Sequence, residues 1–477
     1  MGPEKADKLD RVSAFPTKRF FVEMLTRDIS LEDAVLDLLD NCIDGVVRTR
    51  GASAVNREKQ PYAGFHAHLS FDQDHFLISD NCGGISRELA EKSAFMLGRP
   101  KRGAKQKDVD ADLPTVGVYG IGMKRAIFKM GRYCEVKSTT AHDSFRVTIP
   151  EKWFGDESDW ELPINDVGKP GKGGTDIRIE KLDKAVSRRF AKTGDFQELF
   201  SKMVGQHYSL IIQKGFEVKV NKEKVTPSPL VFRTVQLDKN YKAGIAPYMF
   251  KGTVEGVEVS LKVGFYRPSV DEDELEHEGE AQSSYDEAGW TVTCNDRVVL
   301  YRDKTRLTGW GEANVPSYHN QFIAISGIVH FRSNDPLKLP VTTTKRGIDA
   351  GSDIYLQVKD RMRDGLKKFT AFTYRLKKDK NEKTKLFNDA KSVNEDVLNA
   401  MSTHIKWRAD PKIKHSQVFV PNLPTIEKND SLRTVRFSKA AEDISKLGVF
   451  LFENSNAEPG DVGERCFDLT LAEAKSK

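Results

Sequence analysis

Three polar residues, Asp37, Asn41 and Asp44, recur at spacings of four and three in the stretch SLEDAVLDLLDNCIDGVV. Apolar residues recur there at i, i+3, i+4 and i+7, which predicts an amphipathic helix capped by Ser30, with Gly45 helping to end it. At about 100° per residue the three polar side chains share one face. A carboxylate there can orient water, and an amide oxygen can hold a hard cation such as Mg²⁺. The simpler interpretation is a solvated polar face, and the helix alone does not decide.

A second polar group follows the strand-like segment HFLIS. Asp80 begins the turn D-N-C-G-G-I, which includes Gly84 and Ile85. A carboxylate at a strand end can accept a hydrogen bond from an exocyclic amine, while glycine lets a flat ring approach the backbone. An ordinary Asx turn would use the same residue types.

A third segment is rich in glycine and leads into the helix-like KRAIFKMG. Its residues of interest are Gly117, Gly120, Ile121, Gly122, Met123 and Lys124. Free backbone N–H groups before a helix can bind phosphate, and Lys124 can add a positive charge. A Walker A loop would need lysine at Met123, and a Rossmann motif starting at Gly120 would need glycine at Arg125. The segment is therefore a different kind of phosphate loop.

The chain resembles the Bergerat-fold GHKL ATPases in four motifs that occur in the family's order. They are the D-x-x-x-N helix, D-N-C-G-G-I, G-x-x-G-x-G-M-K and Gly174-Thr175. That superfamily includes gyrase B subunits, MutL, heat-shock chaperones, histidine kinases and MORC proteins. The resemblance implies ATP and Mg²⁺ as cofactors, with Asn41 as the magnesium ligand. It also implies that Asp80 accepts from the adenine amine and that Thr175 binds adenine through water.

The same resemblance makes Asp37 the group that activates the attacking water. The family usually has glutamate at this position, and aspartate is one methylene shorter, so the helix lies closer, an extra water intervenes, or hydrolysis is slow. Cys82 also replaces the usual first glycine of its motif. Residues 96–116 would form the ATP lid, although an ordinary exposed loop is equally compatible.

Further along, LPVTTTKRGID resembles the transducer-domain loop whose lysine reaches the γ-phosphate, which makes Lys345 the candidate sensor. The runs H-Y-S-L (207–210) and N-D-R (295–297) look closest to MORC-like proteins and their bacterial relatives, the bacterial heat-shock-chaperone-like ATPases among them. Such a protein is expected to form an ATP-dependent homodimer that acts on DNA or a partner protein.

The expected fold is α+β: a Bergerat-fold α/β sandwich with a mixed sheet covered by helices, a ribosomal-protein-like transducer domain, and a small C-terminal α/β region. The expected domains are 1–185 for ATP binding, 186–375 for the transducer, and 376–477 for a linker and the small region. In the last of these, LRTVRFS is expected to be a strand and AAEDISKLGVFLF a helix.

Composition narrows the class of protein without identifying it. The formal net charge of +5 is too small to indicate nucleic-acid binding by itself, and five scattered cysteines predict neither disulfides nor a zinc site. No apolar run is long enough to span a bilayer, so we expect a cytoplasmic protein without a membrane partner. Two alternatives remain: a nucleotide-gated binding module with negligible hydrolysis, and an ATPase subunit of a DNA-topology or defence complex.

Overall fold

The computed structural model describes residues 17–97, 112–117, 120–157, 159–191, 194–268, 287–376, 386–424, 435 and 437–476. The chain divides into two compact units, Met1–Pro424 and Thr425–Lys477. Most of the predicted lid and most of the predicted strand LRTVRFS lie outside the described residues. No described helix combines the length and apolar character needed to cross a membrane.

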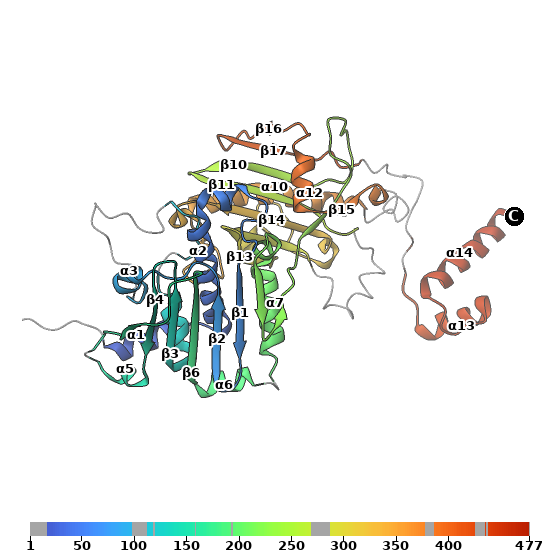
Figure 1. Cartoon of the computed structure of the whole chain (residues 1–477). Coiled ribbons are helices and arrows are strands. Elements are labelled where there is room, and N and C mark those ends of the chain that lie inside the picture. The colour runs from blue at the N-terminus through green and yellow to red at the C-terminus, as the bar shows by residue number, and fades with distance from the viewer. Residues whose placement is uncertain are drawn as a thin grey trace, which may run out of the picture. The chain divides into compact units, whose positions relative to one another are not determined.

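The first unit contains an eight-stranded mixed sheet in the order β5-β4-β3-β6-β2-β1-β7-β8 (Figure 1). Its strands are β1 His66–Phe71, β2 His75–Asp80, β3 Gly131–Thr139, β4 Ser144–Ile149, β5 Ile164–Asp166, β6 Gly174–Leu182, β7 Glu217–Val220 and β8 Glu223–Lys224. All neighbours are antiparallel except β1 and β7, which run parallel. Strands β7 and β8 of this sheet come after residue 185 in the chain, where the first domain was expected to end. The sheet therefore includes residues from beyond that expected boundary.

Helices cover this sheet and connect its strands. They are α1 Lys18–Arg27, α2 Leu31–Arg57, α3 Arg87–Leu89, the π-helix η1 Ala90–Ala94, α4 Gly122–Met130, α5 Glu151–Gly155, α6 Lys184–Phe190, α7 Phe196–His207 and α8 Ser209–Gln213. One large apolar cluster joins α2, α4 and α7 to the strands. The mixed sheet covered by helices fits the expected Bergerat fold.

Helix α2 begins as the sequence predicts but ends later. The Ser30 side chain accepts a hydrogen bond from Asp33 N at 3.0 Å, and acidic residues in the first turn favour the helix dipole. The helix then passes Gly45 and continues to Arg57, with a backbone break at Gly51 (φ 77°). The proposed end at Gly45 is therefore wrong. A Cβ at Gly45 would lie 2.6 Å from Cys82 O, so this glycine instead allows α2 to approach the turn after β2.

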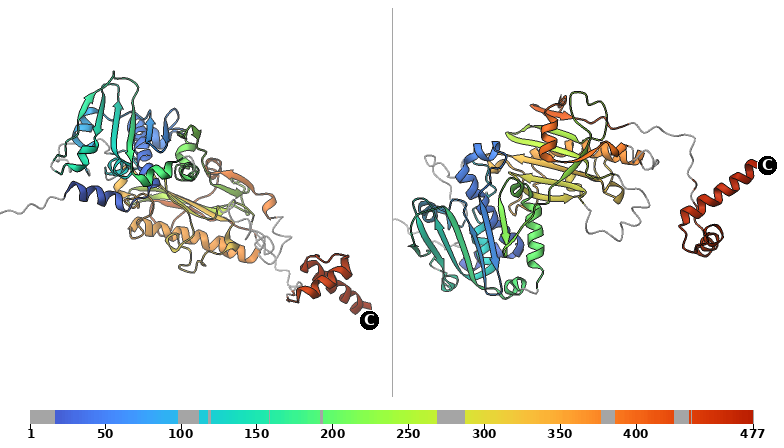
Figure 2. Two further views of the ribbon diagram at one scale, coloured as in Figure 1. Left: turned by 90° about the horizontal axis from the view of Figure 1, so that it is seen from below. Right: turned by 45° about the vertical axis from the view of Figure 1, so that its right-hand side comes forward.

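A second sheet of seven strands has the order β13-β12-β14-β11-β10-β17-β16. Its strands are β10 Tyr248–Val254, β11 Val257–Phe265, β12 Gly289–Cys294, β13 Arg297–Asp303, β14 Ile325–Arg332, β16 Arg408–Ala409 and β17 Ser416–Phe419. Helix α10, Asp353–Leu376, packs on β10 and β11 and lies along one face of this sheet (Figure 2). Short 3₁₀ turns η2 Arg306–Thr308, η3 Asn320–Phe322 and η4 Pro336–Lys338 connect these elements.

Residues beyond the expected boundary at 375 also join the first unit. Strand β15, Lys391–Asn394, pairs with β9, Val231–Thr234, and β17 pairs with β10. Helix α12, Glu395–Ser402, follows β15. The separate unit therefore begins at Thr425. Its described elements are two helices, α13 Ala441–Phe452, which matches the predicted helix, and α14 Pro459–Ser476.

Candidate functional site

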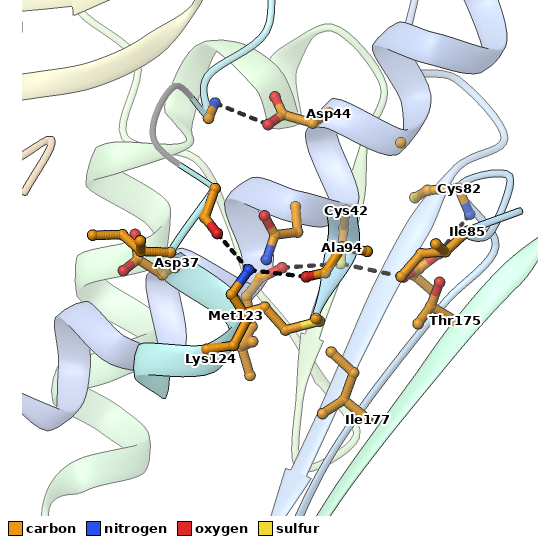
Figure 3. Close-up of a pocket in the computed structure, with 18 of the residues that line it drawn as sticks. Asp37, Cys42, Asp44, Cys82, Ile85, Ala94, Met123, Lys124, Thr175 and Ile177 are labelled. Atoms are coloured by element: carbon orange, nitrogen blue, oxygen red, sulfur yellow. Dashed lines mark hydrogen bonds between the residues drawn. The ribbon is translucent and has the colours of Figure 1, made fainter. Parts of the chain in front are cut away.

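The residues singled out from the sequence line one pocket. They are Asp37, Asn41, Asp44, Asp80, Gly84, Ile85, Gly117, Gly120, Ile121, Gly122, Met123, Lys124, Thr175 and Lys345. In Figure 3, Cys82, Ile85 and Thr175 lie on one side of the pocket and Asp37 on the other. Helix α2, the end of β2, the start of β6 and the loop before α4 build the walls, and the loop holding Lys345 reaches in from beyond β14.

Asp80 marks the end of the pocket formed by strands. Its Oδ1 accepts from Cys82 N at 2.7 Å and its Oδ2 lies 3.5 Å from Cys42 Sγ. Burial raises the pKa of Asp80, and the hydrogen bonds from Cys82, Cys42 and the Thr175 backbone only partly oppose this. A buried carboxylate with few strong donors gains from a ligand N–H, as the adenine assignment requires.

Glycines leave the floor beside Asp80 without side chains. Gly84 has φ 73°, and a Cβ on it would lie 2.1 Å from Thr139 O. A Cβ on Gly174 would lie 2.3 Å from Asp80 O. Neither position accepts a side chain without moving backbone, so both glycines are needed for the close approach of β2, β3 and β6.

Asp44 anchors the glycine-rich loop at the other end. Its Oδ1 accepts from Val116 N at 2.6 Å, and its Oδ2 accepts from Gly117 N at 2.8 Å. Lys124 donates to Ala94 O at 2.9 Å and to Gly120 O, so its ammonium ties the loop to η1. These bonds show Asp44 and Lys124 holding the loop, and the expectation from the sequence that both also contact the nucleotide stays a prediction.

Asp37, the candidate base, is 3% exposed and meets two cations. Its Oδ2 accepts from Arg125 Nε at 3.1 Å and also from Arg125 Nη2. Its Oδ1 lies 3.4 Å from Lys345 Nζ. Both oxygens of the carboxylate therefore face positive charge.

Asp40, one turn further along α2, is 1% exposed and shares the same lysine. Its Oδ2 accepts from Lys345 Nζ at 2.8 Å, and its Oδ1 accepts from Arg297 Nε at 3.0 Å and from the Tyr208 hydroxyl. Burial alone would raise the pKa of Asp40, but Lys345 and Arg297 outweigh burial and lower it to about 2. For Lys345, burial opposes the charged form, yet Asp40, Asp37 and Asp44 raise its pKa.

The loop that carries Lys345 has a specific backbone conformation. A bridge between Val341 and Ile348 closes it, and Lys345 N donates to Thr342 O at 2.9 Å. Lys345 itself has φ 57°, in the left-handed region that non-glycine residues seldom adopt. The closed loop thus directs the lysine side chain toward α2.

The turn between β12 and β13 contacts the loop before α4 and the end of helix α8. Asn295 and Asp296 have φ of 48° and 67°, as a two-residue type I′ hairpin requires. Asn295 Nδ2 donates to Thr115 O at 3.0 Å, close to the glycine-rich loop. Asp296 binds Lys214 at 2.7 Å and also Arg332, and the next residue is Arg297, the partner of Asp40.

Four residues of this network were not assigned a role from the sequence: Asp40, Arg125, Tyr208 and Arg297. Tyr208 and Arg297 belong to the H-Y-S-L and N-D-R runs, which were noted only as family resemblances. One signal was present for Asp40, because a charged residue directly after Leu38 and Leu39 interrupts the apolar pattern of the helix. Arg125 served only to exclude a Rossmann motif, and no local pattern indicates its partner.

The residues present fit a magnesium ion held mainly by a nucleotide. Asn41 lines the pocket, and its Nδ2 is buried with no hydrogen-bond partner among the described residues, so the amide nitrogen can donate to a ligand oxygen. No cluster of three His, Cys, Asp or Glu residues within the described ranges could hold a metal. Mg²⁺ commonly takes one or two protein oxygens together with phosphates and water, a role that the Asn41 oxygen can fill.

Comparison with known proteins identifies the fold of this region. Residues 29–167 match the family model described as "Histidine kinase-, DNA gyrase B-, and HSP90-like ATPase". The matched segment contains α2, the turn after β2 and the loop before α4, and it ends before Thr175 and Lys345. A comparison with curated proteins finds no match. Residues 29–167 therefore carry a GHKL-type ATPase domain, and such domains bind ATP, generally with Mg²⁺.

Proposed function

We propose that the protein is a Mg²⁺-dependent ATPase, related to MORC-like proteins, in which ATP binding closes the lid and brings two copies together as a clamp or switch on DNA or a partner protein. The observation that carries the proposal is the position of Lys345. This lysine lies on the loop after β14, yet it enters a pocket whose other lining residues, apart from Thr175, Ile177 and Thr343, come from the matched segment 29–167.

Each end of the pocket has a role in this proposal. Asp80 accepts from the adenine amine, and Thr175 assists through water. The N–H groups around Gly120 and Gly122, at the start of α4, hold the phosphates. Asn41 holds Mg²⁺, which supplies charge stabilisation at the phosphates when it is bound.

Hydrolysis needs Asp37 as a general base. An oxygen of Asp37 takes the proton of the attacking water while the new P–O bond forms and the bond to the ADP oxygen breaks. The Cβ of Asp37 lies 3.2 Å from the position that a Cβ on Gly122 would occupy, so helix α2 lies very close to the phosphate loop. This close approach offsets the shorter aspartate side chain.

The test compares phosphate release at saturating Mg-ATP for the wild type, Asp37→Asn and Asp33→Asn. Asp33 lies one turn earlier on α2 and pairs with Arg346 at 3.1 Å, so it controls for loss of an acidic residue on this helix. We expect Asp37→Asn to lower turnover by about 10²-fold or more and to retain nucleotide binding, because only the base is removed. Full turnover in Asp37→Asn would exclude Asp37 as the base.

The proposed dimer and DNA dependence are tested in the same preparation. Sedimentation with and without a nonhydrolysable ATP analogue should show a doubling of mass with the analogue. Stimulation of phosphate release by double-stranded DNA would favour a clamp on DNA. An unchanged mass with bound analogue would contradict the dimer.

A nucleotide-gated binding module with negligible hydrolysis is the second candidate. The contacts of Asp37 favour it, because Arg125 and Lys345 occupy both oxygens of the base in this structure. The module binds ATP and changes its partner affinity without measurable phosphate release. Turnover that Asp37→Asn abolishes would exclude it.

A further inference from the structure

Lys345 is shared between two carboxylates, and each of these has a second cation of its own. Asp37 has Arg125 on Oδ2, and Asp40 has Arg297 on Oδ1. Within ion-pairing distance the cluster thus holds three cations and two carboxylates. If Lys345 leaves, two one-to-one pairs remain.

The two arginines are held more firmly than the lysine. Arg297 is 1% exposed, donates to Val298 O at 2.6 Å, and lies over the Tyr208 ring at 4.5 Å. Arg125 makes two hydrogen bonds to one oxygen from helix α4. Lys345 instead donates one hydrogen bond, to Asp40 Oδ2 at 2.8 Å, approaches Asp37 only to 3.4 Å, and extends from a loop on a flexible side chain.

We propose that Arg125 and Arg297 are positioning residues, each acting as the fixed counterion of one carboxylate, so that the shared Lys345 can leave Asp40 and Asp37 for the terminal phosphate of the nucleotide. This inference rests on the proposed ATPase function. Departure of Lys345 leaves no buried carboxylate without a partner, and it frees Oδ1 of Asp37 while Arg125 keeps Oδ2 in place. The same movement of Lys345 then binds the terminal phosphate and exposes the Asp37 base.

The third carboxylate near Lys345 does not replace these partners. Asp44 contributes to the electrostatic environment of Lys345, but its two oxygens already accept from Val116 N and Gly117 N. It holds the loop whether or not the lysine moves. The release of Lys345 therefore depends on the two arginines.

The experiment measures dissociation constants for ADP and for a nonhydrolysable ATP analogue, both with Mg²⁺, and uses their ratio as the readout. Arg297 is not among the residues that line the pocket. In Arg297→Gln, Lys345 becomes the only cation left to Asp40, so we expect the preference for the analogue over ADP to fall by about tenfold, the size expected for one hydrogen bond to a charged group. ADP binding should stay within about threefold of wild type, as no contact near Asp80 changes.

Three further variants keep the test decisive. Arg332→Gln is the matched control, because Arg332 pairs with Asp296 near the same hairpin turn and Asp296 keeps Lys214. It should leave the ratio unchanged. Arg125→Gln should lower the ratio as Arg297→Gln does, and Arg297→Lys should restore part of it. If Arg297→Gln fails to fold, Arg125→Gln and Arg297→Lys still give the ratio.

The dependence on Lys345 is tested in a Lys345→Met background, where Arg297→Gln should change the ratio no further. An unchanged ratio in both arginine variants, or an equal loss in the Lys345→Met background, would overturn the inference while leaving ATP binding intact. A wild type that binds neither nucleotide would overturn the proposed function and this inference together.

Discussion

Replacing Gly117 with alanine should uncouple the glycine-rich loop from helix α2. A Cβ at this position would lie 2.5 Å from Asp44 Oδ2, the same oxygen that accepts from Gly117 N at 2.8 Å. Asp44 would have to rotate away, and that rotation would also break its bond from Val116 N. The loop would then lose the anchor that holds its N–H groups toward the pocket.

The magnitude follows from the two lost bonds. Hydrogen bonds to charged groups contribute about 1.5–3 kcal/mol each, and water recovers part of this in a displaced loop. A net cost of about 1.5–3 kcal/mol corresponds to nucleotide affinity lower by about 10- to 100-fold. Titration calorimetry with Mg-ADP measures it directly. The control is Gly171→Ala, since nothing lies within 4 Å of a Cβ there. Binding within about twofold of wild type in Gly117→Ala, or an equal loss in Gly171→Ala, would contradict the anchoring role of Asp44.

Further predictions concern the adenine end, the acidic network and the packing of α2. Asp80→Asn should weaken the binding of ADP and of the ATP analogue alike, by about tenfold, because it removes a charged acceptor. A loss of affinity that differs between the two nucleotides would place Asp80 away from the adenine. The pKa of Asp40 and that of Asp296 are each about 2, below the ordinary aspartate value near 3.9, so each should stabilise the fold by about 2–3 kcal/mol above pH 4 and lose this as the pH falls toward 2. Denaturant unfolding at pH 5 and pH 3 checks this, and a free energy independent of pH would contradict it. Gly45→Ala should destabilise the protein by about 1–3 kcal/mol, because its Cβ would meet the Cys82 backbone at 2.6 Å; an unchanged thermal midpoint would show that α2 can shift.

The sequence was informative where function depends on short-range pattern. The spacing of Asp37, Asn41 and Asp44 fixed their common side of α2, because side-chain direction in a helix follows from position alone. The strand-like HFLIS and the helix-like KRAIFKMG also followed from local pattern, and they correspond to β2 and α4. The glycines of the turn and the loop could be recognised because their conformational freedom is a local property.

The boundaries of elements and domains were harder to predict from local pattern. Gly45 suggested a helix end, yet its absent side chain serves a contact with Cys82, 37 residues away. Strands β7 and β8 pair within the first sheet although they lie beyond residue 185, the expected end of the first domain. Strands β15, β16 and β17 pair with strands of the expected transducer domain or with each other, although they lie beyond residue 375. Pairing between distant strands is decided by the packing of the whole unit, and short segments do not encode their partner.

The ionic network could be recognised only in the folded protein. Sequence alone determined which residues could bind a nucleotide and in what order they occur along the chain. It did not determine that Lys345 would meet Asp40, 305 positions away, or that Arg125 and Arg297 would each hold one carboxylate. Ion pairs form in the interior only where packing removes water and brings charges within contact, and that arrangement exists only after both sheets and α2 have come together.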